Sequence, residues 1–331
     1  MKKLGWIKCI TFFLIFLLLL CTGCQKKETE IIRLNEVVHS IFYAPQYVAM
    51  EKGFFKEEGL EIELSIGWGA DKSMTALVSK NADIALMGTE ASIYVYNQGK
   101  EDYVINFAQL TQKAGNFLVA REPDSTFTWE KAKGKTIVGG RPGGMPQMVL
   151  EYILKQNEIQ PFEDVNIITN LQFNATAGAF IGGTGDYTVE FEPAASTIEA
   201  EGAGYVVASL GTASGNVPYT AYAATQEYIE KNPDRIQRFT NAIYKAQQWV
   251  EENEPEEIAK VIQPHFAETD LDLITTIVRR YKDQGSWSLN PVFEKESLDL
   301  LQDILEMAGE LEKRVPYEDI VNTDFAHQAI K

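Results

Sequence analysis

The order of strand-like and helix-like segments constrains the fold of this chain more than any other feature. Short β-branched runs alternate with helical patterns from Glu30 to about Arg121, and the alternation starts again beyond Glu122. The strand-like runs of the two series are EIIRLNEVV, EIELSIGW, DIALMG, YVINFAQLT and GNFLVAR, and then KTIVGG, VNIITNL, DYTVEFEP and GYVVASLG. Such alternation predicts two α/β lobes, each with a largely parallel sheet.

A stretch of helical patterns alone follows from about Gln226. In NPDRIQRFTNAIYKAQQWVEEN, Asn232 is a candidate helix cap, Pro233 suits the first turn, and apolar residues recur every three or four positions. ETDLDLITTIVRRYKD and EKESLDLLQDILEMAGELEK are two further amphipathic helices with charged faces. We expect a helical C-terminal tail that returns to the first lobe.

The first residues have the pattern of an export signal. Lys2, Lys3 and Lys8 precede the apolar run ITFFLIFLLLL, which is shorter than the roughly 20 residues of a membrane-spanning helix. The small pair Thr22-Gly23 in front of Cys24 resembles the lipobox of bacterial lipoproteins, with cysteine at position 21 where leucine is usual. We therefore predict a signal peptide at 1–23, lipidation of Cys24, and a polar tether at 24–32.

Cysteine content and charge exclude several classes of function. The cysteines at positions 9, 21 and 24 all lie in or at the end of the signal, so the exported chain has no disulfide and must be held by its core. The formal net charge is −17, and removal of the lysines at 1–23 makes it more negative. Phosphate backbones require a basic face, so we expect no nucleic-acid partner.

Catalytic and metal-binding signatures are weak in this sequence. The only histidines are His39, His265 and His327, far apart in sequence, and no free thiolate remains after export to complete a metal site. No G-x-S-x-G motif is present, which leaves hydrolysis only through scattered residues as an alternative. We predict no metal, no cofactor and no catalytic residue.

The glycine-rich segment TIVGGRPGGMPQMVLEYIL raises the question of phosphate binding. Its glycines at 139, 140, 143 and 144 match neither the dinucleotide nor the P-loop spacing. Two interpretations stay open. The start of the helix offers backbone N–H groups to a ligand, or the glycines serve a tight turn with unusual dihedral angles. Both can hold at once, since glycine lets a ligand approach the backbone closely.

Polar and aromatic residues follow several of the predicted strands. Ligands in open α/β sheets bind beyond the carboxyl ends of strands, so these segments are expected to converge on one cleft. Taken singly, Trp68 is better explained by packing and Glu190 by solvation, but the shared position of these residues after strands favours a joint site. The residues concerned are Ser40, Tyr43 and Gln46; Trp68 and Gly69; Gly88, Thr89 and Glu90; and Glu190 and Glu192.

Several longer segments resemble one family of solute-binding lipoproteins of ABC importers. They are YAPQYVAMEKGFFKEEGLEIEL, ALVSKNADIALMGTEASI, GKTIVGGRPGGMPQMVLEYILKQNEI and EFEPAASTIEAEGAGYVVASLG. The family includes alkanesulfonate-, taurine- and thiamine-pyrimidine-binding proteins and is related to the pyrimidine synthase of thiamine biosynthesis. The similarity runs from about Ile31 to Leu210 and, more loosely, into the helical tail.

The resemblance implies a type II periplasmic-binding-protein fold, with two α/β lobes joined by a hinge. Lobe one would comprise 33–120 plus 219–331 and lobe two 121–218, with crossover strands near 117–121 and 217–223. The residues implied for the ligand site are Tyr43, Gln46, Trp68, Thr89 and Glu90 from lobe one, and Gly143, Gly144, Met145, Asn174, Glu190 and Glu192 from lobe two.

The implied function is that of a monomeric, lipid-anchored extracytoplasmic receptor. It would close around a small solute and deliver it to an ABC permease. The carboxylates of Glu90, Glu190 and Glu192, with the aromatic rings of Tyr43 and Trp68, favour an amino-substituted heteroaromatic solute, such as a thiamine-precursor pyrimidine, over a sulfonate.

Three alternatives stay open. One is an enzyme similar to the pyrimidine synthase, which the export signal and the absence of that enzyme's cysteine-rich motif oppose. The second is a receptor for a sulfonate, and the third is a lipoprotein sensor without a role in transport.

Overall fold

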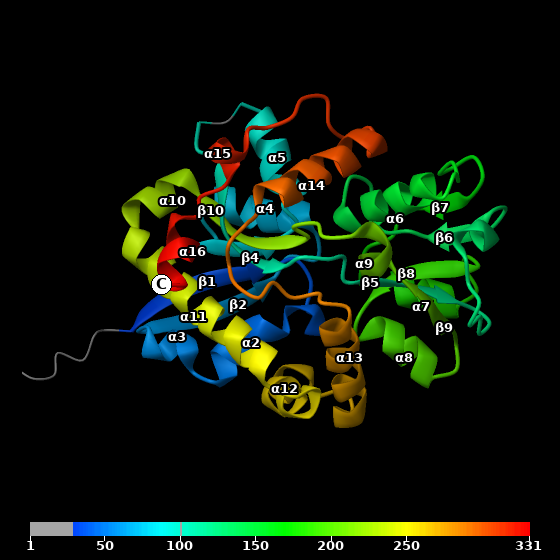
Figure 1. Cartoon of the computed structure of the whole chain (residues 1–331), viewed down its shortest axis with the longest axis horizontal. Coiled ribbons are helices and arrows are strands. Elements are labelled where there is room, and N and C mark those ends of the chain that lie inside the picture. The colour runs from blue at the N-terminus through cyan, green and yellow to red at the C-terminus, as the bar shows by residue number, and fades with distance from the viewer. Residues whose placement is uncertain (1–28, 100) are drawn as a thin grey trace, which may run out of the picture.

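The computed structural model describes residues 29–99 and 101–331, which form two α/β lobes lying side by side (Figure 1). The predicted signal peptide and Cys24 lie outside the described residues. Residues 30–32, predicted as part of the tether, belong instead to the first strand, because they pair with 60–62. Within the described ranges, none of the helices is both long and apolar enough to cross a membrane.

The first sheet has five strands in the order β2-β1-β3-β10-β4. The strands β1, β2 and β3 pair in parallel, whereas β10 runs antiparallel to both β3 and β4. Their bounds are β1 Glu30–Glu36, β2 Leu60–Ile66, β3 Ile84–Met87, β4 Val104–Thr111 and β10 Thr220–Thr225.

The second sheet repeats this plan in the order β7-β6-β8-β5-β9. The strands β6, β7 and β8 pair in parallel, and β5 runs antiparallel to β8 and β9. Their bounds are β5 Asn116–Ala120, β6 Thr136–Val138, β7 Asn166–Ile168, β8 Tyr187–Phe191 and β9 Tyr205–Ser209.

Both sheets are mixed, so the expectation of largely parallel sheets is wrong in this respect. The chain enters the second sheet through β5 and returns to the first through β10, and each of these strands runs against its neighbours. A strand that arrives from the other lobe lacks the local helical crossover that parallel pairing needs. The structure thus places 116–120 in the second sheet, whereas the division above assigns these residues to lobe one.

Helices cover the sheets of both lobes. Those that follow the strands of the first sheet are η1 Ile41–Tyr43, α2 Ala44–Glu51, α3 Phe54–Glu57, α4 Ala70–Val78 and α5 Glu90–Asn97. Those of the second lobe are η2 Trp129–Ala132, α6 Met145–Gln156, α7 Thr176–Ile181, α8 Ala194–Ala200 and α9 Leu210–Ser214. The tail contains α10 Gln226–Lys231, α11 Pro233–Glu252, α12 Pro255–Ile262, η3 Gln263–Phe266, α13 Leu271–Asp283, α14 Lys295–Ala308, α15 Tyr317–Ile320 and α16 Asp324–Ala329.

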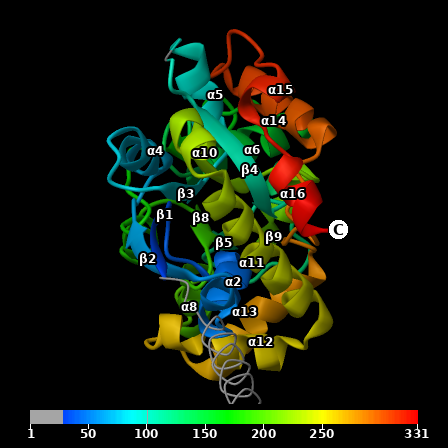
Figure 2. The same cartoon turned by 90° about the vertical axis from the view of Figure 1, so that its left-hand side faces the viewer.

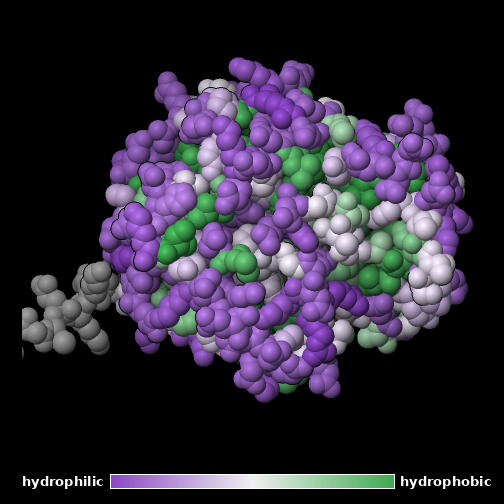
Figure 3. Space-filling view, in the orientation of Figure 1, coloured by the Kyte–Doolittle hydropathy of each residue, from purple (hydrophilic) through white to green (hydrophobic). Residues whose placement is uncertain are grey.

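The tail contacts both lobes. Its longest helix, α11, packs against α2 and α3 of the first lobe and against α16 of the tail itself. Figure 2 shows α11 beside α2 and α16. In contrast, α14 packs against α6 of the second lobe. Asn232 precedes α11 as predicted, but its side chain donates to the carbonyl of Tyr228 at 3.0 Å instead of capping the helix. The outer face in Figure 3 is mostly hydrophilic, as expected for a chain rich in acidic residues.

Two connecting segments cross between the sheets and are bonded to each other. The N–H of Val217 donates to the carbonyl of Gln112 at 3.0 Å, and the hydroxyls of Thr111 and Thr220 lie 2.6 Å apart. Gly115 lies in the first crossing, where a Cβ would approach the ring of Phe42 to 2.6 Å. Glycine is therefore required at this close approach.

Candidate functional site

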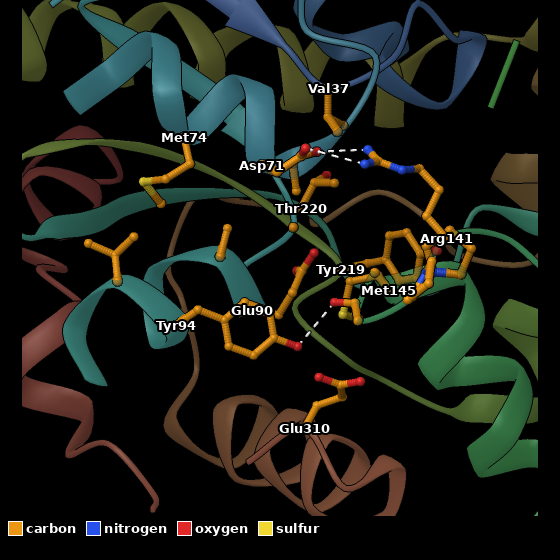
Figure 4. Close-up of a pocket in the computed structure, with 18 of the residues that line it drawn as sticks. Val37, Asp71, Met74, Glu90, Tyr94, Arg141, Met145, Tyr219, Thr220 and Glu310 are labelled. Carbon is orange, nitrogen blue, oxygen red and sulfur yellow. Dashed lines mark hydrogen bonds and ion pairs between the residues drawn. The ribbon is translucent and has the colours of Figure 1, made fainter. Parts of the chain in front are cut away.

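A cavity of about 500 Å³ lies between the two lobes, and we call it the principal cavity because five of the expected site residues line it. Helices α4 and α5 of the first lobe form one wall, and the loop from β6 to α6 forms the opposite wall (Figure 4). The side chains that matter most here are those of Tyr43, Asp71, Met74, Glu90, Tyr94, Arg141, Met145, Phe173, Phe191, Tyr219 and Glu310.

A second, smaller cavity of about 190 Å³ adjoins the first. Pro146, Phe173 and Phe191 line both cavities and form the partition between them. The other polar and aromatic residues of this second cavity are His39, Trp68, Asn116, Asn174, Thr176, Glu190 and Glu192.

Nine of the eleven residues expected in a ligand site line one of these two cavities. Five line the first cavity: Tyr43, Glu90, Gly143, Gly144 and Met145. Four line the second: Trp68, Asn174, Glu190 and Glu192.

Gln46 and Thr89 line neither cavity, which corrects their expected position. Gln46 is fully buried, donates to the Glu36 carboxylate at 2.7 Å and accepts from the Tyr222 hydroxyl at 3.1 Å. Thr89 donates to the carbonyl of Pro218 at 3.0 Å and so fixes the second crossing between the lobes. The side chains of Gln46 and Thr89 therefore form hydrogen bonds that stabilise the fold.

Glu90 is the most unusual side chain of the principal cavity. It is 2% exposed, and its Oε2 has no hydrogen-bond partner among the described residues. Burial raises the pKa of Glu90 to about 8, although the N–H groups of Glu90 and Met145 favour the ionised form. Its carboxylate turns back over Gly88, where a Cβ would lie 2.0 Å from Oε2. Only glycine at position 88 leaves room for this arrangement.

Tyr43 provides a second buried polar atom without a partner. The residue is fully buried, and no described group within hydrogen-bonding distance meets its hydroxyl. Burial raises the pKa of Tyr43 well above its usual value, so the hydroxyl is neutral and can donate or accept. Orphaned polar atoms are costly inside a protein, and two of them on one cavity indicate a polar ligand.

Glu190 and Glu192 have different surroundings in spite of their proximity in sequence. Glu190 is 3% exposed, accepts from Thr188 at 2.6 Å and from Thr176 at 3.0 Å, and forms no ion pair with any residue that the structure describes. Burial raises the pKa of Glu190 to about 7. Glu192 instead forms an ion pair with Arg280 at 2.7 Å and accepts from both the N–H and the hydroxyl of Ser196. Glu190 is therefore the carboxyl of this pair that a solute can use.

The glycine-rich loop is shaped by its own hydrogen bonds. Gly143 has a φ of 67°, and its N–H donates to Oε1 of Gln147 at 2.8 Å. The amide of Gln147 in turn donates to the buried Glu151. The tight-turn interpretation of the glycines is thus confirmed, and the turn holds the N-terminus of α6 toward the first lobe.

Two contacts bridge the mouth of the principal cavity. Arg141 of the second lobe pairs with Asp71 of the first through bonds of 2.7 and 3.2 Å, and the Tyr94 hydroxyl donates to the carbonyl of Gly143 at 3.0 Å (Figure 4). At the other end of the cleft, the Ser40 hydroxyl donates to the carbonyl of Glu192 at 2.5 Å. The structure is therefore a closed arrangement of the two lobes.

We predict that Arg141→Ala weakens solute binding about two- to fivefold. Asp71 is 60% exposed, so this ion pair contributes no more than about 1 kcal/mol to the closed state. Isothermal titration measures the affinity, and small-angle scattering measures the fraction of closed protein. Lys133→Ala removes a charge from the same lobe without touching the cleft and should change neither. Equal effects of both variants would contradict the prediction.

Trp68 has a left-handed backbone with a φ of 58° between two glycines. This conformation is uncommon for a bulky residue and marks a constrained position. The side chain is half-buried and lines the second cavity, as Glu190 of the other lobe does. The GWG segment therefore orients an aromatic ring into the cleft.

His39, which also lines the second cavity, lies between two hydrogen-bond acceptors. Its Nδ1 is 2.7 Å from a carboxylate oxygen of Glu36, and its Nε2 is 2.8 Å from the carbonyl of His265. Only the doubly protonated ring donates to both. Burial opposes the charge, but these bonds outweigh burial and raise the pKa of His39 above its usual 6.5.

This arrangement predicts a pH-dependent stability. Since the folded pKa exceeds the unfolded one, the contribution of His39 is complete below about pH 6.5 and is lost as the pH rises through the folded pKa. The free energy of unfolding of the wild type should therefore exceed that of His39→Gln by more at pH 5.5 than at pH 9. Urea unfolding at both values measures the difference, and a gap independent of pH would refute the role of the charge.

Several residues of the cleft were not identified from sequence. Tyr94 was detectable, because it lies four residues after Glu90 on one helix and hence on the same face. Glu310 and Tyr219 carry no local signal, since the tail and the second crossing bring them to the cavity. No cluster of histidine, cysteine and acidic side chains suited to a metal ion occurs in the parts of the chain that the structure describes.

Comparison with known proteins gives the family. Residues 31–263 match the NMT1-like family. The protein YtlA of Bacillus subtilis (strain 168), named only as a binding protein, is 50% identical over 315 residues, which are 95% of this chain and 94% of YtlA. The nitrate/nitrite binding protein NrtA of Nostoc sp. (strain PCC 7120 / SAG 25.82 / UTEX 2576) is 24% identical over 245 residues, covering 66% of this chain and 54% of NrtA.

Solved structures share the two-lobed fold. The alkanesulfonate-binding protein SsuA from Xanthomonas axonopodis pv. citri, bound to MOPS, superimposes with a TM-score of 0.72 at 14% identity, covering 89% of this chain and 99% of SsuA. The ligand-binding component of an ABC-type import system from Staphylococcus aureus gives a TM-score of 0.71 at 15% identity, with 91% and 99% covered. The expected periplasmic-binding-protein fold is thus confirmed, and the chain belongs to the NMT1-like family.

Proposed function

We propose that this protein is the solute-binding component of an ABC importer and that its solute is an amino-substituted heteroaromatic compound, such as a thiamine-precursor pyrimidine. It is anchored outside the cytoplasmic membrane through a lipid on Cys24, acts as a monomer, and passes its solute to a permease after closure of the two lobes. The closed arrangement described above supports this mechanism, because a ligand that contacts both lobes stabilises closure by its differential affinity.

The observation that carries the proposed solute class is the orphaned Oε2 of Glu90 on the wall of the principal cavity. A carboxyl group pairs with an amino group and an adjacent ring nitrogen through two parallel hydrogen bonds. The Tyr43 hydroxyl is also unpartnered, and Tyr43 lines the same cavity. The aromatic rings that line the cavity and suit a planar solute are those of Tyr43, Tyr94, Phe173, Phe191 and Tyr219.

The charges around the cleft argue in the same direction. The principal cavity is lined by the carboxylates of Asp71, Glu90 and Glu310, and its single lining arginine, Arg141, is already paired with Asp71. Relatives that bind nitrate or alkanesulfonate take anions, which require converging donors and positive charge. A cleft with this acidic lining is better suited to a solute that donates hydrogen bonds.

Isothermal titration with a defined panel tests the solute class. We expect saturable binding of 4-amino-5-hydroxymethyl-2-methylpyrimidine and none of taurine, nitrate or bicarbonate at equal ionic strength. Ligand-linked closure should appear as a decrease of the radius of gyration in scattering. Tight taurine binding with no affinity for aminopyrimidines would favour the sulfonate receptor instead.

The anchor and the enzymatic alternative need separate measurements. Mass spectrometry of the native N-terminus should find a diacylglyceryl group on Cys24. Turnover of a bound pyrimidine or its precursor during prolonged incubation would favour the synthase-like enzyme. A permease and an ATPase encoded beside this gene would support transport over sensing.

A further inference from the structure

The second cavity is lined by a residue with a free hydrogen-bond donor. Asn116, at the start of β5, lines this cavity and is 1% exposed. Its Oδ1 accepts a hydrogen bond from the hydroxyl of Tyr219, which lines the principal cavity. This bond fixes the orientation of the amide and leaves Nδ2 without a partner in the part of the chain that the structure describes. A buried amide N–H without an acceptor is costly, so Asn116 favours a ligand that accepts a hydrogen bond.

The same cavity is lined by a buried carboxyl group, that of Glu190. The hydroxyls of Thr188 and Thr176 donate to one carboxyl oxygen each, at 2.6 and 3.0 Å. Each oxygen keeps a second lone pair, so the carboxyl group can still accept a hydrogen bond from a ligand.

The charged neighbours of these two groups are already engaged. Both ring nitrogens of His39 lie within hydrogen-bonding distance of acceptors, and the carboxylate of Glu192 pairs with Arg280. No lysine or arginine is among the described residues that line the cavity, so an anion would meet Glu190 without a compensating charge. A cation without an acceptor would leave the amide of Asn116 unpaired. An uncharged group that both donates and accepts, such as a carboxamide, satisfies both residues.

The size and walls of the cavity indicate a side group of a larger solute. Its volume of about 190 Å³ is below the roughly 300–1,000 Å³ of pockets that enclose a whole drug-sized ligand. Phe173 and Phe191 line both cavities, so a solute in the principal cavity lies next to the second one. Trp68 lines the second cavity from the first lobe, and closure of the lobes therefore completes it.

We propose that the second cavity is a subsite for an uncharged polar side group of the solute, of the carboxamide type, which accepts from Asn116 and donates to Glu190. The ring of the solute then occupies the principal cavity, a step that rests on the proposed function. The subsite is defined by its own lining residues, so a small probe tests it without the solute.

Acetamide, acetate and acetamidinium are suitable probes, because they have similar shapes and differ in charge and hydrogen-bonding groups. In a proton–nitrogen correlation NMR spectrum, acetamide should shift the indole resonance of Trp68 saturably, whereas acetate and acetamidinium should not at the same concentration and ionic strength. Trp68→Phe assigns the resonance, and Trp129, which lines neither cavity, is an internal control. No saturable shift with acetamide, or an equal shift with either charged probe, would overturn the inference.

Two variants locate the bound probe. Ala177→Leu places a larger side chain in the wall of the second cavity, and Asn116→Leu removes the free donor at similar volume. Each should weaken acetamide binding about fivefold or more. Ala175→Leu makes the same change as Ala177→Leu at an exposed residue that lines neither cavity, and it should bind like the wild type. Circular dichroism and thermal unfolding establish that each variant is folded. Acetamide binding that neither variant weakens would contradict the subsite.

Two aminopyrimidines connect the subsite to the solute. The wild type should bind 4-amino-2-methylpyrimidine-5-carboxamide about tenfold more tightly than 4-amino-2,5-dimethylpyrimidine, and Ala177→Leu should abolish this difference. Equal affinities of the wild type for the two compounds would overturn the assignment of the subsite to a side group of the solute. If neither aminopyrimidine binds while acetamide still shifts the Trp68 resonance, the proposed function fails and the subsite is supported.

Discussion

Arg280→Ala should lower the free energy of unfolding by about 2–4 kcal/mol at pH 7.5. Arg280 lies on α13 of the tail, and its guanidinium lies 2.7 Å from the Glu192 carboxylate at the end of β8 and 3.1 Å from Glu199. Removing one partner of a buried ion pair typically costs 3–5 kcal/mol, because a carboxylate remains buried and unpaired. The expected loss is smaller here because the side chain of Arg280 is 27% exposed.

The loss should depend on pH in a defined direction. Burial already raises the pKa of Glu192, and the charge of Arg280 opposes that rise. Without the arginine the pKa increases further, so the folded variant binds a proton that its unfolded chain releases, and its stability falls as the pH rises. Urea unfolding should therefore show a gap between wild type and variant that widens from pH 5 to pH 8.

The matched control is Arg314→Ala. Arg314 also pairs with two acidic residues, Asp303 and Glu306, but its side chain is 40% exposed, and surface pairs contribute up to about 1 kcal/mol. We expect a small change that is nearly independent of pH. Equal losses of stability in the two arginine variants would show that the ion pair between Arg280 of the tail and Glu192 of the second sheet does not stabilise the fold by the amount expected here.

Glu90→Leu should weaken the binding of an aminopyrimidine about 100-fold, or about 3 kcal/mol. Leucine fills a similar volume but leaves the amino group and ring nitrogen of the solute without partners in a buried site. Titration of the same aminopyrimidine with both proteins measures the loss. Glu296→Leu changes an exposed glutamate in the first turn of α14 and should bind like the wild type.

Glu90→Gln should show whether solute binding depends on the shape of the carboxyl group or on the proton that it carries. A paired ring and carboxyl group share one proton, and the raised pKa of Glu90, about 8, supplies that proton near neutrality. Above this pH binding must take up a proton, so the affinity of the wild type should fall by up to tenfold per pH unit. The amide of glutamine presents the same donor and acceptor, so Glu90→Gln should bind within about tenfold at pH 7 and without this decline. An aminopyrimidine affinity that is flat with pH in the wild type would exclude the shared proton.

Much of the fold could be predicted because the sequence patterns that specify its helices and strands are short-range. Alternating short β-branched runs and helical patterns set the two series of α/β units, and the apolar stripe of Pro233–Glu252 set the longest helix. Mixed strand pairing could not be predicted in the same way. The sequences of β5 and β10 do not indicate which sheet each strand joins. Their antiparallel pairing follows from the path of the chain between the lobes.

The candidate site was predicted in part, for a related reason. Residues that follow a strand, such as Glu90 and Gly143, could be placed because strand ends of one sheet converge on one edge. Gln46 also follows the first strand, but its side chain bonds to Glu36 and Tyr222 in the core. The position of a residue directly after a strand predicts the edge of the sheet at which the residue lies. The direction of its side chain depends on the residues packed around it.

The sequence by itself thus determined the two α/β lobes, the helical tail, and most of the segments that meet at the cleft, because short-range periodicity and turn-forming glycines encode them. Only the tertiary structure decided which carboxylates are free. Glu192 pairs with an arginine 88 positions later and Asp71 with one 70 positions later, whereas Oε2 of Glu90 has no hydrogen-bond partner among the described residues. The chemistry of a buried charge depends on partners that are distant in sequence, and only folding brings them together.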